Sequence, residues 1–144
     1  MFASILCPID FSEHAERALG VATRLAAEHH SHLTLLHVTD PLLEAAARTA
    51  GSADAVASQT QAELRALFLR VTPTSGAPPM AVAVVTGAAA TQILAQAADC
   101  GADLIVMGMH GAGGAERFIM GSTTSRVLQD TRVPVLAVPP PRGG

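Results

Sequence analysis

Five short apolar runs alternate with alanine-rich helical stretches along the chain, and this alternation constrains the fold more than any other feature. The runs are rich in Val, Ile and Leu, and turn residues bound each of them: ASILCPI, HLTLLHV, MAVAVVT, DLIVMGM and VPVLAV. Strands that alternate with helices are typical of βαβ units, in which crossover helices cover a parallel sheet. Because only 3% of the residues are aromatic, the core must be aliphatic, which suits helices packed on such a sheet. The sequence therefore predicts an α/β fold.

Helical stretches fill the connections between these runs. Ser12 suits the N-cap position of the first helix, and Gly101 suits the position just after the end of the third. The second connection is expected to hold one helix, and its leading segment from Pro41 to Ala53 has no assignment. Four helices are expected in all: 15–26, about 53–69, one around Ile93, Leu94, Ala97 and Ala98, and 122–129.

The charge and cysteine content exclude several classes of partner. The formal net charge is −3, and arginine supplies all nine basic residues, with no lysine. Because the sequence has no basic run, nucleic acid and anionic membranes are poor partners. Cys7 and Cys100 form no paired motif, which favours a reduced interior, and the sequence shows neither a signal peptide nor an apolar run near the roughly 18 residues of a membrane span. We expect a cytoplasmic protein with a single domain, residues 1–144.

The segment GMHGAGGAERFIMGSTTS, residues 108–125, contains five glycines and four hydroxyl side chains. Its last part precedes the helix expected over 122–129, where free backbone amides and the positive end of the helix dipole favour an anion. Gly121 would let a phosphate approach the backbone, and the hydroxyls of Ser122 to Ser125 are further donors. The segment is thus a candidate phosphate cradle. An ordinary N-cap that follows a flexible glycine loop is the alternative.

Strand ends locate the candidate chemistry, because open parallel sheets bind ligands outside the carboxyl ends of their strands, where the strand order reverses. Asp10 and Ser12 follow the first run, and the glycine segment follows the fourth. If these two strands are neighbours, the aspartate and the glycine segment face one crevice. A Walker A loop and a phospho-acceptor receiver domain are both excluded by the absence of lysine. A dinucleotide-binding fingerprint is excluded because the glycines follow the fourth run instead of the first.

The stretches ILCPIDFSEHAERAL, LTLLHV, GADLIVMGMHG and GSTTSRVLQDTRVPVLAV together resemble a single-domain universal stress protein, in the family's order and over nearly the whole chain. The spacing Gly-x2-Gly-x9-Gly-Ser is similar to that of the family's ATP-binding members. This resemblance implies an open five-stranded parallel sheet of order 3-2-1-4-5 with helices on both faces, an adenine nucleotide alpha hydrolase-like fold. The first and fourth strands would then be neighbours.

The same resemblance implies a set of ligand-binding residues for ATP. Adenine and ribose would lie beside Pro8, Ile9, Asp10 and Val38, with the backbone of Val38 at the adenine edge. The ribose and phosphate path would be lined by Met107, Gly108 and Gly111, and the phosphates would be held by Gly121, Ser122 and Thr123. Asp10 would also approach a magnesium ion on the phosphates. Thr123 stands where the family often has valine, a change that a backbone contact tolerates.

The fifth run raises the question of what covers its edge. Pro134 cannot donate a ladder hydrogen bond, which favours an edge position for this strand. The apolar edge from Val133 to Val138 is covered either by the triple proline that follows or by a second copy of the chain. The family resemblance implies a homodimer through this strand, which favours the second alternative.

Other residues admit two interpretations each. The cluster of His29, His30 and His32 suggests a metal site, but adjacent histidines point apart, so a solvated helix end is the simpler interpretation. His110 lies inside the glycine segment, where it either touches phosphate or is merely exposed. Arg117 either neutralises part of the triphosphate or is a surface charge.

Three functions are compatible with these residues. The first is an ATP-binding module for stress response or regulation, the second is a slow ATPase, and the third is a nucleotide-free dimeric interaction protein. Phosphoryl transfer needs an oriented water, a base and charge neutralisation, and the glycine segment has one arginine, one histidine and no lysine. We therefore expect any turnover to be slow, and we assign no catalytic residue.

Overall fold

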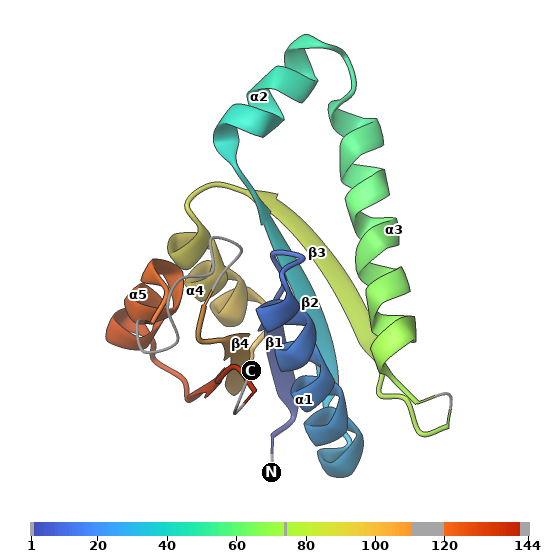
Figure 1. Cartoon of the computed structure of the whole chain (residues 1–144), viewed down its shortest axis with the longest axis vertical. Helices are drawn as coiled ribbons and strands as arrows, with labels where there is room; N and C mark the ends of the chain where they lie inside the picture. The colour runs from blue at the N-terminus through green and yellow to red at the C-terminus, as the bar shows by residue number, and fades with distance from the viewer. Residues whose placement is uncertain (1, 74, 111–119, 142–144) are drawn as a thin grey trace.

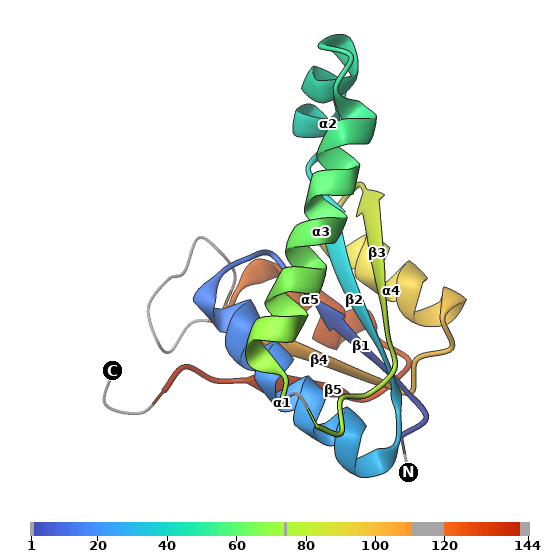
Figure 2. The same cartoon turned by 90° about the vertical axis from the view of Figure 1, so that its right-hand side faces the viewer.

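The computed structural model of the chain describes residues 2–73, 75–110 and 120–141. Five strands form one parallel sheet of order β3-β2-β1-β4-β5 (Figures 1 and 2). In chain order, the elements are β1 (Ser4–Pro8), α1 (Glu13–His29), β2 (His32–Thr39), α2 (Pro41–Thr49), α3 (Ala53–Val71), β3 (Met80–Thr86), α4 (Ala89–Asp99), β4 (Leu104–Gly108), α5 (Ser122–Asp130) and β5 (Val135–Val138). The predicted α/β fold and strand order are confirmed.

The core lies on both faces of the sheet, because successive strand residues point to opposite sides. Ile5 and Cys7 pack with residues of α1 and α3, whereas Leu6 packs with residues of α4 and α5. Helices therefore cover both faces (Figures 1 and 2). Full burial raises the pKa of the Cys7 thiol, so this cysteine belongs to the core and stays protonated.

Local capping explains where two of the predicted helices begin and end. The Ser12 hydroxyl accepts a hydrogen bond from the Ala15 amide at 3.2 Å, which confirms it as the N-cap of α1. Gly101 follows α4 with a φ of +63°, the left-handed conformation that glycine adopts most easily. Both residues have the roles that the sequence predicted.

The second connection differs from the prediction, since it holds two helices instead of one. Asp40 caps α2 by accepting from the Leu42 amide at 2.7 Å, and Pro41 occupies its first turn. None of the residues of α2 is buried, and the helix lies beyond the end of the sheet (Figure 2). Residues Pro41–Thr49 therefore form a helix through local capping and not through burial of an apolar stripe.

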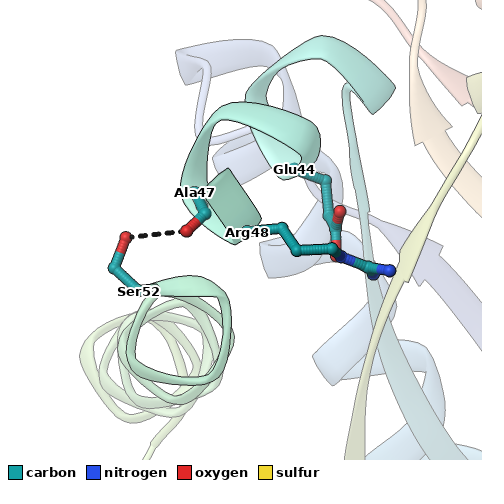
Figure 3. A network of polar contacts seen from close by, with 4 residues as sticks. All are labelled: Glu44, Ala47, Arg48 and Ser52. Carbon is teal, nitrogen blue, oxygen red and sulfur yellow. Dashed lines mark hydrogen bonds and ion pairs between the residues drawn. The ribbon is translucent and has the colours of Figure 1, made fainter. Parts of the chain in front are cut away.

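Polar contacts lie within α2 and between α2 and Ser52, the N-cap residue of α3 (Figure 3). The Ser52 hydroxyl donates to the Ala47 carbonyl at 3.2 Å. Within α2, Arg48 pairs with Glu44 one helical turn earlier, at 2.5 Å. This exposed pair adds little to stability.

Strand β5 lies at one edge of the sheet, beside β4, as Pro134 predicted. The Pro134 carbonyl accepts a hydrogen bond from the Ile105 amide at 3.0 Å. Pro134 therefore pairs with β4 as an acceptor, just before β5 begins. Within residues 2–73, 75–110 and 120–141, every helix is too short or too polar to cross a lipid bilayer.

Candidate functional site

The sheet order reverses between β1 and β4. Strand β1 pairs with β2 on one side and with β4 on the other, with Ile5 opposite Leu104 and Leu6 opposite Ile105. All of these pairings are parallel, so the carboxyl ends of β1 and β4 lie at the same edge of the sheet. This is the position where open α/β sheets bind ligands, and the predicted adjacency of the two strands is confirmed.

The chain leaves β1 through three residues that the sequence singled out. Pro8 is the last residue of the strand, and the buried Ile9 continues its pairing by donating from its amide to the Leu36 carbonyl at 2.7 Å. Asp10 is exposed, and its Oδ1 accepts from the amide and the hydroxyl of Ser12, at 3.0 and 2.5 Å. Asp10 is thereby held at the start of α1.

Phe11, which the sequence analysis did not single out, has a strained backbone. Its φ of +63° lies in the left-handed region that non-glycine residues rarely adopt. The side chain is 42% exposed, and its ring lies 5.1 Å from the ring of His37. The Nδ1 of His37 lies 2.8 Å from the Ile9 carbonyl oxygen. These two rings therefore lie beside the path of the chain out of β1. In the sequence, a phenylalanine between Asp and Ser did not indicate this position.

The first turn of α5 is fastened to the end of β4. The Gly121 amide donates to the Met109 carbonyl at 2.7 Å, and the Thr124 hydroxyl donates to the Gly108 carbonyl at 2.8 Å. Thr124 is buried, so its hydroxyl serves this inward contact and is not the ligand donor that the sequence suggested. Ser122, in the same turn, is exposed.

Backbone amides at the start of α5 come before its internal hydrogen bonds. Gly121 is the N-cap residue, and the first helical bond runs from the Ser125 amide to the Gly121 carbonyl at 2.9 Å. The amides of Ser122 and Thr123 lie in the first turn, where a helix has no acceptors of its own for them. Together with the helix dipole, this makes the start of α5 attractive to an anion.

Gly108 and His14 are in close contact where α1 crosses the end of β4. A Cβ atom placed on Gly108 would lie 2.9 Å from the His14 Cβ and 3.1 Å from the His14 carbonyl carbon and oxygen. The glycine therefore lets helix and strand approach, a packing role that the sequence analysis missed. The His14 ring in turn lies 5.3 Å from the ring of His110 in an edge-to-face arrangement.

The other residues that the sequence predicted to contact the nucleotide lie in β2, in β4 or outside the described residues. Val38 is half-buried near the end of β2, opposite Val85 in the register, two residues beyond the pairing of Pro8 with Leu36. Met107 is buried among residues of α4 and α5, so its side chain belongs to the core and only its backbone is left to face a ligand. Gly111 and Arg117 lie outside the described residues.

The histidines after α1 show no metal-binding geometry. His30 ends the helix with a left-handed φ of +55°, and the ring of His29 lies edge-on to Phe2. No cluster of three or more His, Cys, Asp or Glu side chains suited to a metal ion occurs in the part of the chain that the structure describes.

Comparison with known proteins gives consistent results. The model of the Universal stress protein family matches residues 1–139. A protein of Thermus aquaticus, "Universal stress protein in QAH/OAS sulfhydrylase 3'region", is 33% identical over 96% of this chain and 99% of its own length. The solved structure of the hypothetical protein MJ0577, described as a structure-based assignment of biochemical function, superposes with a TM-score of 0.83 at 26% identity, over 99% of both chains. A universal stress protein solved in complex with cAMP has the same fold, with a TM-score of 0.71 at 20% identity over 95% of this chain and 96% of its own.

Proposed function

The chain belongs to the universal stress protein family, and on this premise we propose that it binds an adenine nucleotide, ATP, and acts as a nucleotide-dependent regulatory module in a stress response. One observation carries the proposal: the open first turn of α5 is bonded to the end of β4, at the same sheet edge as Asp10 after β1. The nucleotide complex of a distant relative is in keeping with it.

The phosphates belong at the start of α5 in this proposal. Gly121 has no side chain to obstruct them, and the amides of Ser122 and Thr123 precede the first internal bond of the helix. Gly108 and Gly111 would complete the phosphate path. Adenine and ribose would lie toward β1 and β2, beside Pro8, Ile9, Asp10 and the backbone of Val38.

Magnesium enters the proposal through Asp10. Magnesium is usually bound by one or two carboxylates together with substrate phosphates, and Asp10 supplies a carboxylate at the edge where the phosphates are proposed to lie. The Ser12 contacts would hold that carboxylate in place. When bound, the ion would neutralise part of the phosphate charge.

Regulation is proposed over catalysis because the chain lacks lysine, and phosphoryl transfer depends on charge neutralisation and an oriented water. Any hydrolysis should therefore be slow. Single-turnover measurements with labelled ATP separate the two functions, because a rate above about 1 s⁻¹, the low end of typical enzymes, would favour an enzyme.

A homodimer through β5 is part of the proposal. Among the described residues, β5 pairs with a strand on one side only, and Leu136 is 40% exposed on it. Apolar edge strands are liable to pair with another chain. A second copy of β5 would cover this edge.

The direct test is to denature the purified protein and identify any nucleotide that it releases, and then to melt the emptied protein with and without ATP and magnesium. A ligand at a hundred times its dissociation constant stabilises the folded state by about 2.7 kcal/mol, so we expect a clear rise in the melting temperature. No released nucleotide and no thermal shift would reject the proposal and favour a nucleotide-free interaction protein.

A matched pair of variants locates the site. In Gly121→Asp, the new side chain caps α5 and brings a negative charge to the proposed phosphate position. The backbone there is extended, with a φ of −62°, a conformation that residues with a side chain also adopt. Ala88→Asp adds the same cap and charge to α4, whose N-cap residue is also extended and makes no side-chain capping bond. We expect only Gly121→Asp to abolish the ATP-dependent shift, and equal shifts in both variants would contradict the proposed site.

A further inference from the structure

His110 is buried without a hydrogen-bond partner. The residue is 4% exposed, and neither ring nitrogen has a partner among the described residues. A neutral imidazole has one donor and one acceptor, and a buried polar group without a partner destabilises the folded state. An apolar residue of similar size would fill the position without this penalty. A buried histidine at this position therefore indicates a role other than filling the core.

The backbone around His110 is fixed at the point where three elements meet. The Met109 amide donates to the Val138 carbonyl of β5 at 3.0 Å, and the Met109 carbonyl accepts from the Gly121 amide at 2.7 Å. His110 is thus one residue away from the contact that holds the start of α5. Its ring meets His14, in the first turn of α1, at 5.3 Å. The backbone next to His110 is therefore bonded to the start of α5, and its ring lies beside the start of α1.

We propose that His110 recognises phosphate: on binding, it donates a ring N–H to a phosphate oxygen of the nucleotide, while the His14 ring supports it from α1. This inference rests on the proposed function and adds a specificity to it. His110 would favour nucleotides with phosphates over the bare nucleoside, because adenosine has no oxygen for this contact. Binding would change the surroundings of the ring, since both ring nitrogens are buried without a partner among the described residues.

The test compares His110→Leu with the parent protein in their affinity for ATP and for adenosine, measured by calorimetry. Leucine fills the buried position and removes both nitrogens. A hydrogen bond to a charged group corresponds to about a tenfold or greater change in affinity. We expect His110→Leu to weaken ATP binding at least tenfold and to leave adenosine binding within twofold. The matched control is His32→Leu. His32 is exposed and lies at the start of β2, at the amino ends of the parallel strands, so this variant should leave both affinities unchanged.

The outcomes separate this inference from the proposed function. If the parent protein binds neither ATP nor adenosine, the proposed function fails and this inference fails with it. If the parent protein binds ATP and His110→Leu binds it equally well, or loses ATP and adenosine affinity alike, only the role of His110 is rejected.

Nuclear magnetic resonance of the parent protein gives a second measurement that needs no variant. With ¹⁵N-labelled histidine, ATP should shift the ring-nitrogen resonances of His110 strongly, while adenosine should leave them near their nucleotide-free positions. Equal shifts with both ligands, or none with either in a protein that binds them, would overturn the inference.

Discussion

Asp103 ties the start of the chain to the turn before β4. Its carboxylate accepts hydrogen bonds from the amides of Ala3 at 2.9 Å and Ser4 at 3.1 Å. The bond from Ala3 is the main cause that holds the pKa of Asp103 below its ordinary value, while desolvation opposes the shift. A group with a lowered folded-state pKa stabilises the protein above its unfolded-state pKa, near 3.9 for Asp, and the contribution is lost as the pH falls through the folded-state value.

The prediction is therefore that Asp103→Asn lowers the free energy of unfolding at pH 7 and that the difference from the parent protein shrinks below about pH 4. Urea denaturation at pH 7, 5, 4 and 3 measures it. Asp99→Asn, an exposed position at the end of α4, is the control. A difference that stays constant across this pH range would show that the Asp103 carboxylate is not responsible.

Gly108 gives a second prediction at the scale of one residue. Gly108→Ala should destabilise the protein by about 1–3 kcal/mol, the usual result of overpacking, because the new methyl group would lie 2.9 Å from the His14 Cβ and 3.1 Å from its backbone. Gly20→Ala is the matched control, since a Cβ there meets nothing within 4 Å and the position is inside α1. That control should be neutral or stabilise by up to about 1 kcal/mol. Chemical denaturation compares them, and equal stabilities would refute the close contact.

Sequence reasoning succeeded at residues whose roles are local. Ser12 caps a helix through the amide three positions later, and Gly101 ends one through its own φ. The residues that determine these two roles therefore lie within a few positions of each other in the sequence. His14 and His110 are 96 positions apart in the sequence and meet only through the tertiary fold. The strain at Phe11 likewise depends on the folded path of the chain. No spacing rule connects such residues.

Among the elements, α2 is the one that the sequence analysis missed. The apolar residues of α2 do not form a stripe that faces a core, and that stripe was the signal used for the other helices. Asp40 followed by Pro41 is nevertheless an N-cap and first-turn signature, and this pair could have revealed it. Capping by Asp40 and Pro41 determines where α2 begins, and none of the residues of α2 is buried.

This exposure predicts that the apolar residues of α2 add little to stability. Leu42 and Leu43 are 80% and 68% exposed, so the double variant Leu42→Ser, Leu43→Ser should change the free energy of unfolding by no more than about 0.5 kcal/mol. Leu64→Ala in α3 is the comparison, because Leu64 is fully buried and its truncation should destabilise by about 2–5 kcal/mol. Urea denaturation measures both. A large loss in the α2 variant would mean that these leucines are buried in solution, for example against a second copy.

At the scale of the whole molecule, the pattern of apolar runs was enough to predict a parallel α/β sheet, but it could not predict the strand order. Alternation constrains only which elements follow one another along the chain. The adjacency of β1 and β4, which brings Asp10 and α5 to one edge, was implied by resemblance to a family, because it depends on the side of β1 to which the chain returns after β3.

The same sheet order leaves β5 at an edge, and this leads to a prediction about assembly. If two copies pair through β5, a two-fold axis brings the same strand from each copy together, and an introduced charge lies near its own symmetry mate. Like charges on facing strands destabilise pairing. Leu136→Glu should therefore convert a homodimer into a monomer, measured by light scattering after size-exclusion chromatography. Leu42→Glu introduces the same charge at a more exposed leucine, in α2, and should leave the dimer intact. A parent protein with the mass of one chain would exclude the homodimer, and a dimeric Leu136→Glu would move the interface away from β5. A monomeric Leu42→Glu would place α2 in the contact as well.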